Sequence, residues 1–129
     1  MKTDKVIYIE DSASKYMDIC KYLKTKDTKT VDWVTNAEDA IKQIEAAASE
    51  EAPYDLLVSD MHFDYFGKDD IETGEKTLKL IREKGYTVPA IFYSSQDWVI
   101  PGSIGNIFYN PNRDWELEAD ELFREIKSM

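Results

Sequence analysis

The chain has 129 residues, 43% of them hydrophobic, which suits one domain with a single core. Its net charge of −10 argues against nucleic-acid or anionic-membrane partners, because both bind basic patches. The single cysteine, Cys20, cannot form an internal disulfide, no apolar stretch is long enough to span a bilayer, and the first residues lack a signal-peptide pattern. We therefore expect a cytoplasmic protein.

The first half of the chain alternates between the periods of strands and of helices. Residues 5–9 are rich in β-branched and aromatic side chains and predict a strand. Residues 12–24 carry apolar side chains at helical spacing, which predicts a helix capped by a serine near its start. A shorter strand at 31–34 and a second helix, which Thr35 or Asn36 caps and which runs to about residue 48, repeat this alternation.

The central run Leu56-Leu57-Val58 is apolar without alternation and is too short for a helix. It therefore predicts a strand that is buried on both faces. The strand ends in the carboxylate of Asp60. Ligands of open α/β sheets bind beyond the carboxyl ends of the strands, so we expect Asp60 to lie where the chemistry occurs.

The second half begins with a less regular segment. Residues 61–73 combine aromatic, glycine and acidic residues, which predicts a long loop. Residues 74–84 predict a third helix. Strands are predicted at 90–93 and at 107–109, and a last helix begins near residue 114 and runs close to the end.

Strands that alternate with helices predict parallel pairing in one α/β domain. The last two strands break the alternation, because residues 96–106 between them include Pro101, Gly102 and Gly105, which disfavour a helix. We therefore expect the fourth crossover helix to be shortened or missing. Residues 98–100, Trp-Val-Ile, then either contact a partner or fold back over the sheet.

Acidic side chains stand at the ends of two predicted strands, Glu10 and Asp11 after the first and Asp60 after the third. Like charges this close either raise a pKa or require a cation, and Mg²⁺ suits a set of oxygen ligands. An aspartate carboxylate can attack phosphorus as a nucleophile. A hydroxyl at Ser94, which ends another strand, can hydrogen-bond a phosphoryl oxygen. These residues favour a phosphoryl-acceptor site with a bound metal ion.

The order of these motifs resembles the receiver domain of two-component response regulators. Three motifs follow one another along the chain, each at the end of a separate strand: Glu10-Asp11, Asp60 and Ser94. The resemblance covers nearly the whole chain and implies a single receiver domain over residues 1–129. It also implies a flavodoxin-like α/β fold, a doubly wound parallel sheet of five strands in the order 2-1-3-4-5.

The resemblance also implies roles for individual residues. Asp60 would accept a phosphoryl group from a histidine kinase or a phosphotransfer protein. Ser94 would be the switch hydroxyl, and Ser95 the small residue beside it. The implied Mg²⁺ ligands are Glu10, Asp11, Asp60 and the backbone carbonyl of His62.

Three features depart from the resembled family. In the family, a lysine followed by proline comes after the fifth strand and pairs with the phosphoryl group, whereas this chain has Asn110-Pro111. The loop at 61–73 is longer than usual. The fourth helix is shortened or lost. We expect either that residues 96–104 pack over the fourth and fifth strands or that a second copy of the chain or a protein partner binds there.

Other hypotheses compete with a phosphorylatable single-domain response regulator, which would not be an enzyme acting on a separate substrate. A degenerate receiver that binds proteins without phosphorylation is favoured by the missing lysine and disfavoured by the three acids. A second catalytic aspartate two residues after Asp60 would favour a Mg²⁺-dependent phosphatase, but this chain has His62 there. A flavin-binding protein is disfavoured because Glu10-Asp11 would repel a phosphate.

Overall fold

The computed structural model of the chain describes residues 3–26, 28–60, 64–65, 68–69, 73–94, 100–109 and 114–128. Among these residues, no helix has the length and apolar character needed to cross a bilayer.

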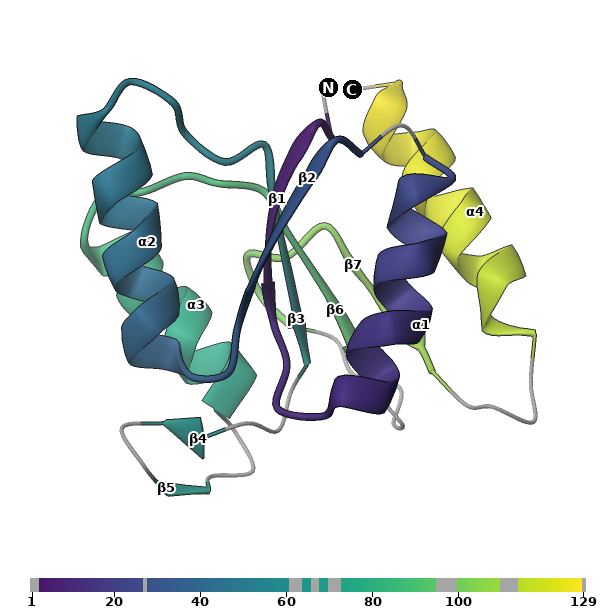
Figure 1. The fold of residues 1–129 in the computed structure, drawn as a ribbon, viewed down its shortest axis with the longest axis horizontal. Coiled ribbons are helices and arrows are strands. Elements are labelled where there is room, and N and C mark those ends of the chain that lie inside the picture. Colours follow the sequence, from purple (N-terminus) through teal and green to yellow (C-terminus); the bar gives the residue numbers. More distant parts are fainter. Residues whose placement is uncertain are drawn as a thin grey trace.

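Five parallel strands form one sheet in the order β2-β1-β3-β6-β7 (Figure 1). Because β6 and β7 are the fourth and fifth strands of this sheet, the predicted order 2-1-3-4-5 and the α/β class are confirmed. The strands are β1 (Lys5–Ile9), β2 (Thr30–Val34), β3 (Leu56–Asp60), β6 (Ala90–Ser94) and β7 (Gly105–Phe108).

The helices cover both faces of the sheet, α1 and α4 on one side and α2 and α3 on the other (Figure 1). Side chains cap the first two helices as the sequence predicts. The Ser12 hydroxyl accepts from the Lys15 amide at 3.5 Å, and the Asn36 side chain accepts from the Asp39 amide at 2.9 Å. The helices are α1 (Ala13–Lys24), α2 (Ala37–Ser49), α3 (Thr73–Glu83) and α4 (Trp115–Lys127).

Each layer of helices has its own apolar core against the sheet. Alternate residues of a strand point to opposite faces, so Leu57 of β3 joins the core under α2 and α3, while Leu56 and Val58 join the core under α1 and α4. Every residue of β3 is buried. The prediction of a central strand buried on both faces is therefore confirmed.

The structure corrects two predictions about local structure. The segment predicted as a long loop contains a small antiparallel ladder, β4 (Asp64–Tyr65) with β5 (Lys68–Asp69). The last strand begins at Gly105, earlier than predicted, because Gly105 pairs with Ile91 in the ladder of β6 and β7. Gly105 also lies close to α4. A Cβ at this position would lie 2.9 Å from Leu122 Cδ1.

The connection between β6 and β7 agrees with the expected loss of a helix as far as it is described. Residues 100–104 contain turns and bends but no helix. Ile100 is 5% exposed and packs into the core under α2 and α3, so this residue folds back onto the protein. Trp98 and Val99 lie outside the described residues.

One carboxylate ties the start of β3 to the start of β1. Oδ2 of Asp55 accepts hydrogen bonds from the amides of Asp4 at 3.1 Å and Lys5 at 3.0 Å. We predict that Asp55→Ala lowers the free energy of unfolding by about 1–3 kcal/mol, because two partly buried amides lose a charged acceptor. Asp55→Asn keeps an acceptor and should lose less. Urea unfolding of the three proteins tests this, and equal stability for both variants would contradict it.

Candidate functional site

Two acids meet because β1 and β3 are adjacent in the sheet. Ile9 pairs with Ser59 in this ladder, so Glu10 follows β1 beside Asp60 at the end of β3. One carboxylate oxygen from each of Glu10, Asp11 and Asp60 lies within 4.8 Å of the others. Glu10 is 0% exposed and Asp60 is 4% exposed, whereas Asp11 is exposed to solvent. The structure thus brings together the three acids singled out from the sequence.

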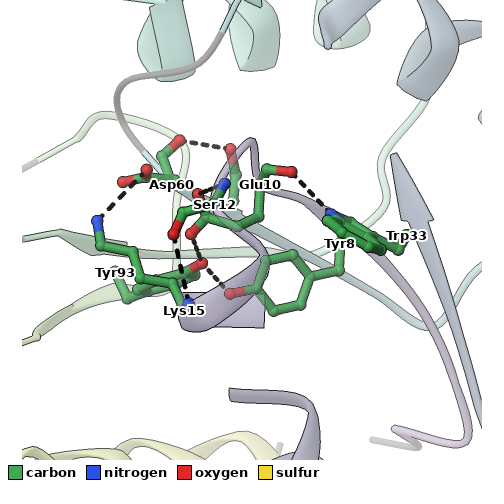
Figure 2. Close-up of polar contacts among 8 residues, drawn as sticks. Tyr8, Glu10, Ser12, Lys15, Trp33, Asp60 and Tyr93 are labelled. Atoms are coloured by element: carbon green, nitrogen blue, oxygen red, sulfur yellow. Dashed lines mark hydrogen bonds and ion pairs between the residues drawn. The ribbon is translucent and has the colours of Figure 1, made fainter. Parts of the chain in front are cut away.

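The Glu10 residue is held by donors from three elements, as Figure 2 shows. The Ser12 amide donates to Oε2 at 3.0 Å, and the Tyr93 hydroxyl of β6 donates to Oε1. The Trp33 indole N–H of β2 donates to the Glu10 backbone carbonyl at 2.7 Å. Because Tyr93 has one hydroxyl proton and gives it to Glu10, Tyr8 is the donor in the hydrogen bond between the two tyrosines. The side chain and backbone of Glu10 are therefore fixed in place.

Burial dominates the electrostatics of this acid. Loss of water raises the pKa of Glu10 to about 8, and the negative charge of Asp60 adds to the rise. The Ser12 amide and the positive charge of Lys15 act in the opposite direction but do not outweigh it. Burial also raises the pKa of Tyr93, which therefore keeps its proton and remains a donor at neutral pH. The ionised form of Glu10 thus needs more positive charge than its neighbours supply.

A lysine also lies at this cluster, and reasoning from the sequence missed it. Lys15 Nζ is 3.6 Å from Asp60 Oδ2, and the two side chains are 28% and 6% exposed (Figure 2). The same ammonium lies 5.9 Å from the ring centroid of Tyr93 and 5.8 Å from that of Tyr109. A signal was present in the sequence: Lys15 stands four residues after Asp11, in the first turn of the predicted helix, and so near the strand end.

The remaining predicted site residues are placed only in part. Ser94 ends β6, one residue after Tyr93, which pairs with Asp60 in the ladder of β3 and β6. The backbone of Ser94 therefore reaches the same edge of the sheet as the acids. Three residues with predicted roles, His62, Ser95 and Asn110, lie outside the described residues.

Comparison with known proteins identifies the fold. No protein-family model and no curated protein matches the sequence. A mutant receiver domain of the histidine kinase CKI1 from Arabidopsis thaliana is similar over 99% of this chain and 92% of that one, with 16% identity and a TM-score of 0.69. The N-terminal domain of a response regulator/sensory box/GGDEF protein from Carboxydothermus hydrogenoformans is similar over 96% and 97%, with 18% identity and a TM-score of 0.64.

A second structure of the CKI1 receiver domain, in complex with Mg²⁺, covers 98% of this chain and 93% of its own, with 16% identity and a TM-score of 0.68. The chain therefore has the receiver fold. At these identities the likeness concerns the fold, and the chemistry has to be argued from the residues of this chain.

The raised pKa of Glu10 predicts how stability depends on pH in the absence of metal ions. Between the ordinary pKa of 4.5 and the folded value of about 8, the native state binds more protons than the unfolded state. The free energy of unfolding should therefore fall as pH rises through this window, by roughly 1 kcal/mol per pH unit. In Glu10→Gln this dependence should be lost, and the variant should gain stability relative to the parent at higher pH.

Urea unfolding in a metal chelator, between pH about 5 and about 8, measures this difference. Glu121→Gln, which makes the same change on the exposed side of α4, should follow the parent. Parallel curves for the parent and Glu10→Gln would show that Glu10 keeps an ordinary pKa.

Proposed function

We propose that this chain is a receiver that accepts a phosphoryl group on Asp60 from a histidine kinase or a phosphotransfer protein. One observation carries the proposal: three carboxylates meet at the carboxyl edge of the receiver sheet, with Asp60 almost fully buried among them. A merely solvating acidic surface would not bury two of three acids side by side. The receiver fold of the similar structures supports the same conclusion.

Asp60 is suited to the nucleophile's role by position and surroundings. It ends a strand buried on both faces, so the backbone behind its carboxylate is rigid. In the proposed step, a carboxylate oxygen of Asp60 forms a bond to phosphorus. The bond between phosphorus and the donor's histidine nitrogen breaks, and its electron pair leaves with the nitrogen. The product is an acyl phosphate on Asp60, and the protein turns over no separate substrate.

The acids also fit a divalent cation. Glu10, Asp11 and Asp60 offer only carboxylate oxygens, the ligand type that Mg²⁺ prefers, and the buried Glu10 needs added positive charge to ionise. The resemblance adds the backbone carbonyl of His62 as a further ligand. When bound, Mg²⁺ would shield the negative charge of an incoming phosphoryl group. A CKI1 receiver domain, similar to this chain at 16% identity, was solved with Mg²⁺ and BeF₃⁻.

A phosphorylation-independent binding module is the second candidate. The residue that favours it is Asn110, which stands where the resembled family has its lysine. Under either proposal, the β6–β7 side of the sheet is the face we assign to a second copy of the chain or to an output partner, because residues 100–104 form no helix there. Phosphorylation of Asp60 separates the two candidates.

Phosphoryl transfer is tested directly by mass spectrometry. We predict that acetyl phosphate with Mg²⁺ adds one phosphoryl group to the parent and none to Asp60→Asn. The side-chain amide of asparagine, unlike a carboxylate, does not attack phosphorus. Beryllofluoride should bind the parent as a phosphoryl mimic without a kinase. A parent that takes up no phosphoryl group from acetyl phosphate or from a phosphohistidine donor would favour the binding module.

Metal binding is tested by thermal unfolding. A cation that binds only the native state stabilises it by mass action, by about 2.7 kcal/mol at a hundredfold excess over its Kd. We predict that Mg²⁺ raises the melting temperature of the parent and raises that of Asp11→Asn less. Glu50→Gln removes an exposed carboxylate at the end of α2 and should respond like the parent. If Mg²⁺ raises the melting temperatures of the parent and of Asp11→Asn equally, Asp11 is not a ligand of the metal ion.

A further inference from the structure

We infer that Lys15, in the first turn of α1, is the cation that binds the phosphoryl group on Asp60 in this protein. The inference rests on the proposed function of Asp60 and names a phosphoryl-binding residue for it. The sequence has asparagine at position 110, so this chain offers no lysine at the place where the resembled family carries one. The structure instead places a lysine of the first helix at the acceptor carboxylate.

The distance between the two groups leaves room for a phosphoryl oxygen. Lys15 Nζ lies 3.6 Å from Asp60 Oδ2. A charge-assisted hydrogen bond to a carboxylate is shorter, about 2.7–2.9 Å, so the contact is an ion pair without a tight hydrogen bond. A phosphoryl oxygen stands two bonds beyond the carboxylate oxygen that carries phosphorus. An ammonium at this distance can donate to that oxygen after a side-chain rotation alone.

The side chain of Lys15 is held near the acceptor from two directions. Helix α1 begins at Ala13, directly after the acids, and the Ser12 hydroxyl caps the Lys15 amide. On the other side, the ammonium lies within about 6 Å of two aromatic ring centroids, the range of a cation–π contact. These rings belong to Tyr93 and Tyr109, so the lysine lies between the acceptor and the ends of β6 and β7.

One of these rings is itself anchored to α1. The Tyr109 hydroxyl donates to Asp18 Oδ2 at 2.6 Å, and Asp18 stands one helical turn after Lys15. Two residues of α1 therefore contact Tyr109: Asp18 accepts from its hydroxyl, and the Lys15 ammonium lies over its ring. A phosphoryl oxygen would compete with the two rings for the same ammonium, so phosphorylation would change what holds the ends of β6 and β7 to α1.

After phosphorylation, the positive charge of Lys15 would offset negative charge at the site. A phosphoryl group carries about −1.5 to −2 charge at neutral pH, and it would stand beside Glu10 and Asp11. Hydrogen bonds from a charged donor are roughly twice as strong as those from a neutral amide. Lys15 is 28% exposed, so solvent screens its charge less than that of a surface lysine. The helix thus supplies the positive charge that Asn110 cannot.

The test compares Lys15→Gln, Lys15→Arg and a matched control, Lys24→Gln, which removes the same charge from the exposed end of α1. Two quantities are measured on the parent and on each variant. The first is the initial rate at which acetyl phosphate, with saturating Mg²⁺, adds a phosphoryl group to Asp60. In this step acetate leaves with the electron pair of the broken bond to phosphorus. The second is the Kd for Mg²⁺ alone, from the change in tryptophan fluorescence, to which Trp33 contributes through its contact with Glu10.

We expect the two quantities to move in opposite directions. Lys15→Gln should slow phosphoryl incorporation by about tenfold or more, because a charged donor is lost. The same variant should bind Mg²⁺ as tightly as the parent or more tightly, because a positive charge has left the three acids. Lys15→Arg should retain most of the rate, and Lys24→Gln should match the parent in both measurements. A side chain that merely supports the fold would weaken both.

The outcomes separate this inference from the proposed function. If the parent and Lys15→Gln incorporate phosphate at equal rates, the inference is wrong and the proposed function stands. If Lys15→Gln loses both rate and Mg²⁺ affinity, Lys15 supports the structure of the site and the inference is also wrong. If the parent incorporates no phosphoryl group from acetyl phosphate or from a phosphohistidine donor, the proposed function fails and the role of Lys15 fails with it.

Discussion

The side chain of Glu10 is fully buried. The need to balance its charge determines which residues surround it at the C-terminal ends of the strands. A buried carboxylate is tolerated only with hydrogen-bond donors and positive charge around it. The Ser12 amide and the Tyr93 hydroxyl supply the donors, and Tyr8 supports Tyr93 from behind. The pKa of Glu10 nevertheless stays raised, so these contacts compensate the charge only in part.

The fold brings the groups that surround Glu10 together. The register of β1 against β3 places Glu10 beside Asp60, and β6 brings Tyr93 to the same edge. Because α1 starts directly after the acids, its first turn carries Lys15 to them. Glu10, Asp11 and Lys15 come from one short stretch of the chain, and the pairing of β1 with β3 brings Asp60 to them. A change in strand register would move Glu10 away from Asp60 and from the Tyr93 hydroxyl.

Much of the fold follows from short-range pattern in the sequence. The apolar run before Asp60, the caps at Ser12 and Asn36 and the position of the acids at strand ends are local signals, and the structure agrees with them. The contacts of Lys15 with Asp60 and of Tyr93 with Glu10 join residues far apart in the chain. Such pairs depend on side-chain directions in the folded sheet, so spacing alone did not predict them. The early start of β7 likewise depends on the pairing of Gly105 with Ile91 of β6.

A charge balance links the lysine, the metal ion and the proton on Glu10. The three carboxylates carry three negative charges when all are ionised. Lys15 supplies one positive charge, so without a metal ion the cluster lowers its excess by keeping a proton on its most buried member, Glu10. A divalent cation together with Lys15 would balance the three carboxylates without that proton. Metal binding should then release a proton from Glu10 and leave a cluster that is neutral when the charge of Lys15 is included. An incoming phosphoryl group would add the negative charge that the ammonium is placed to meet.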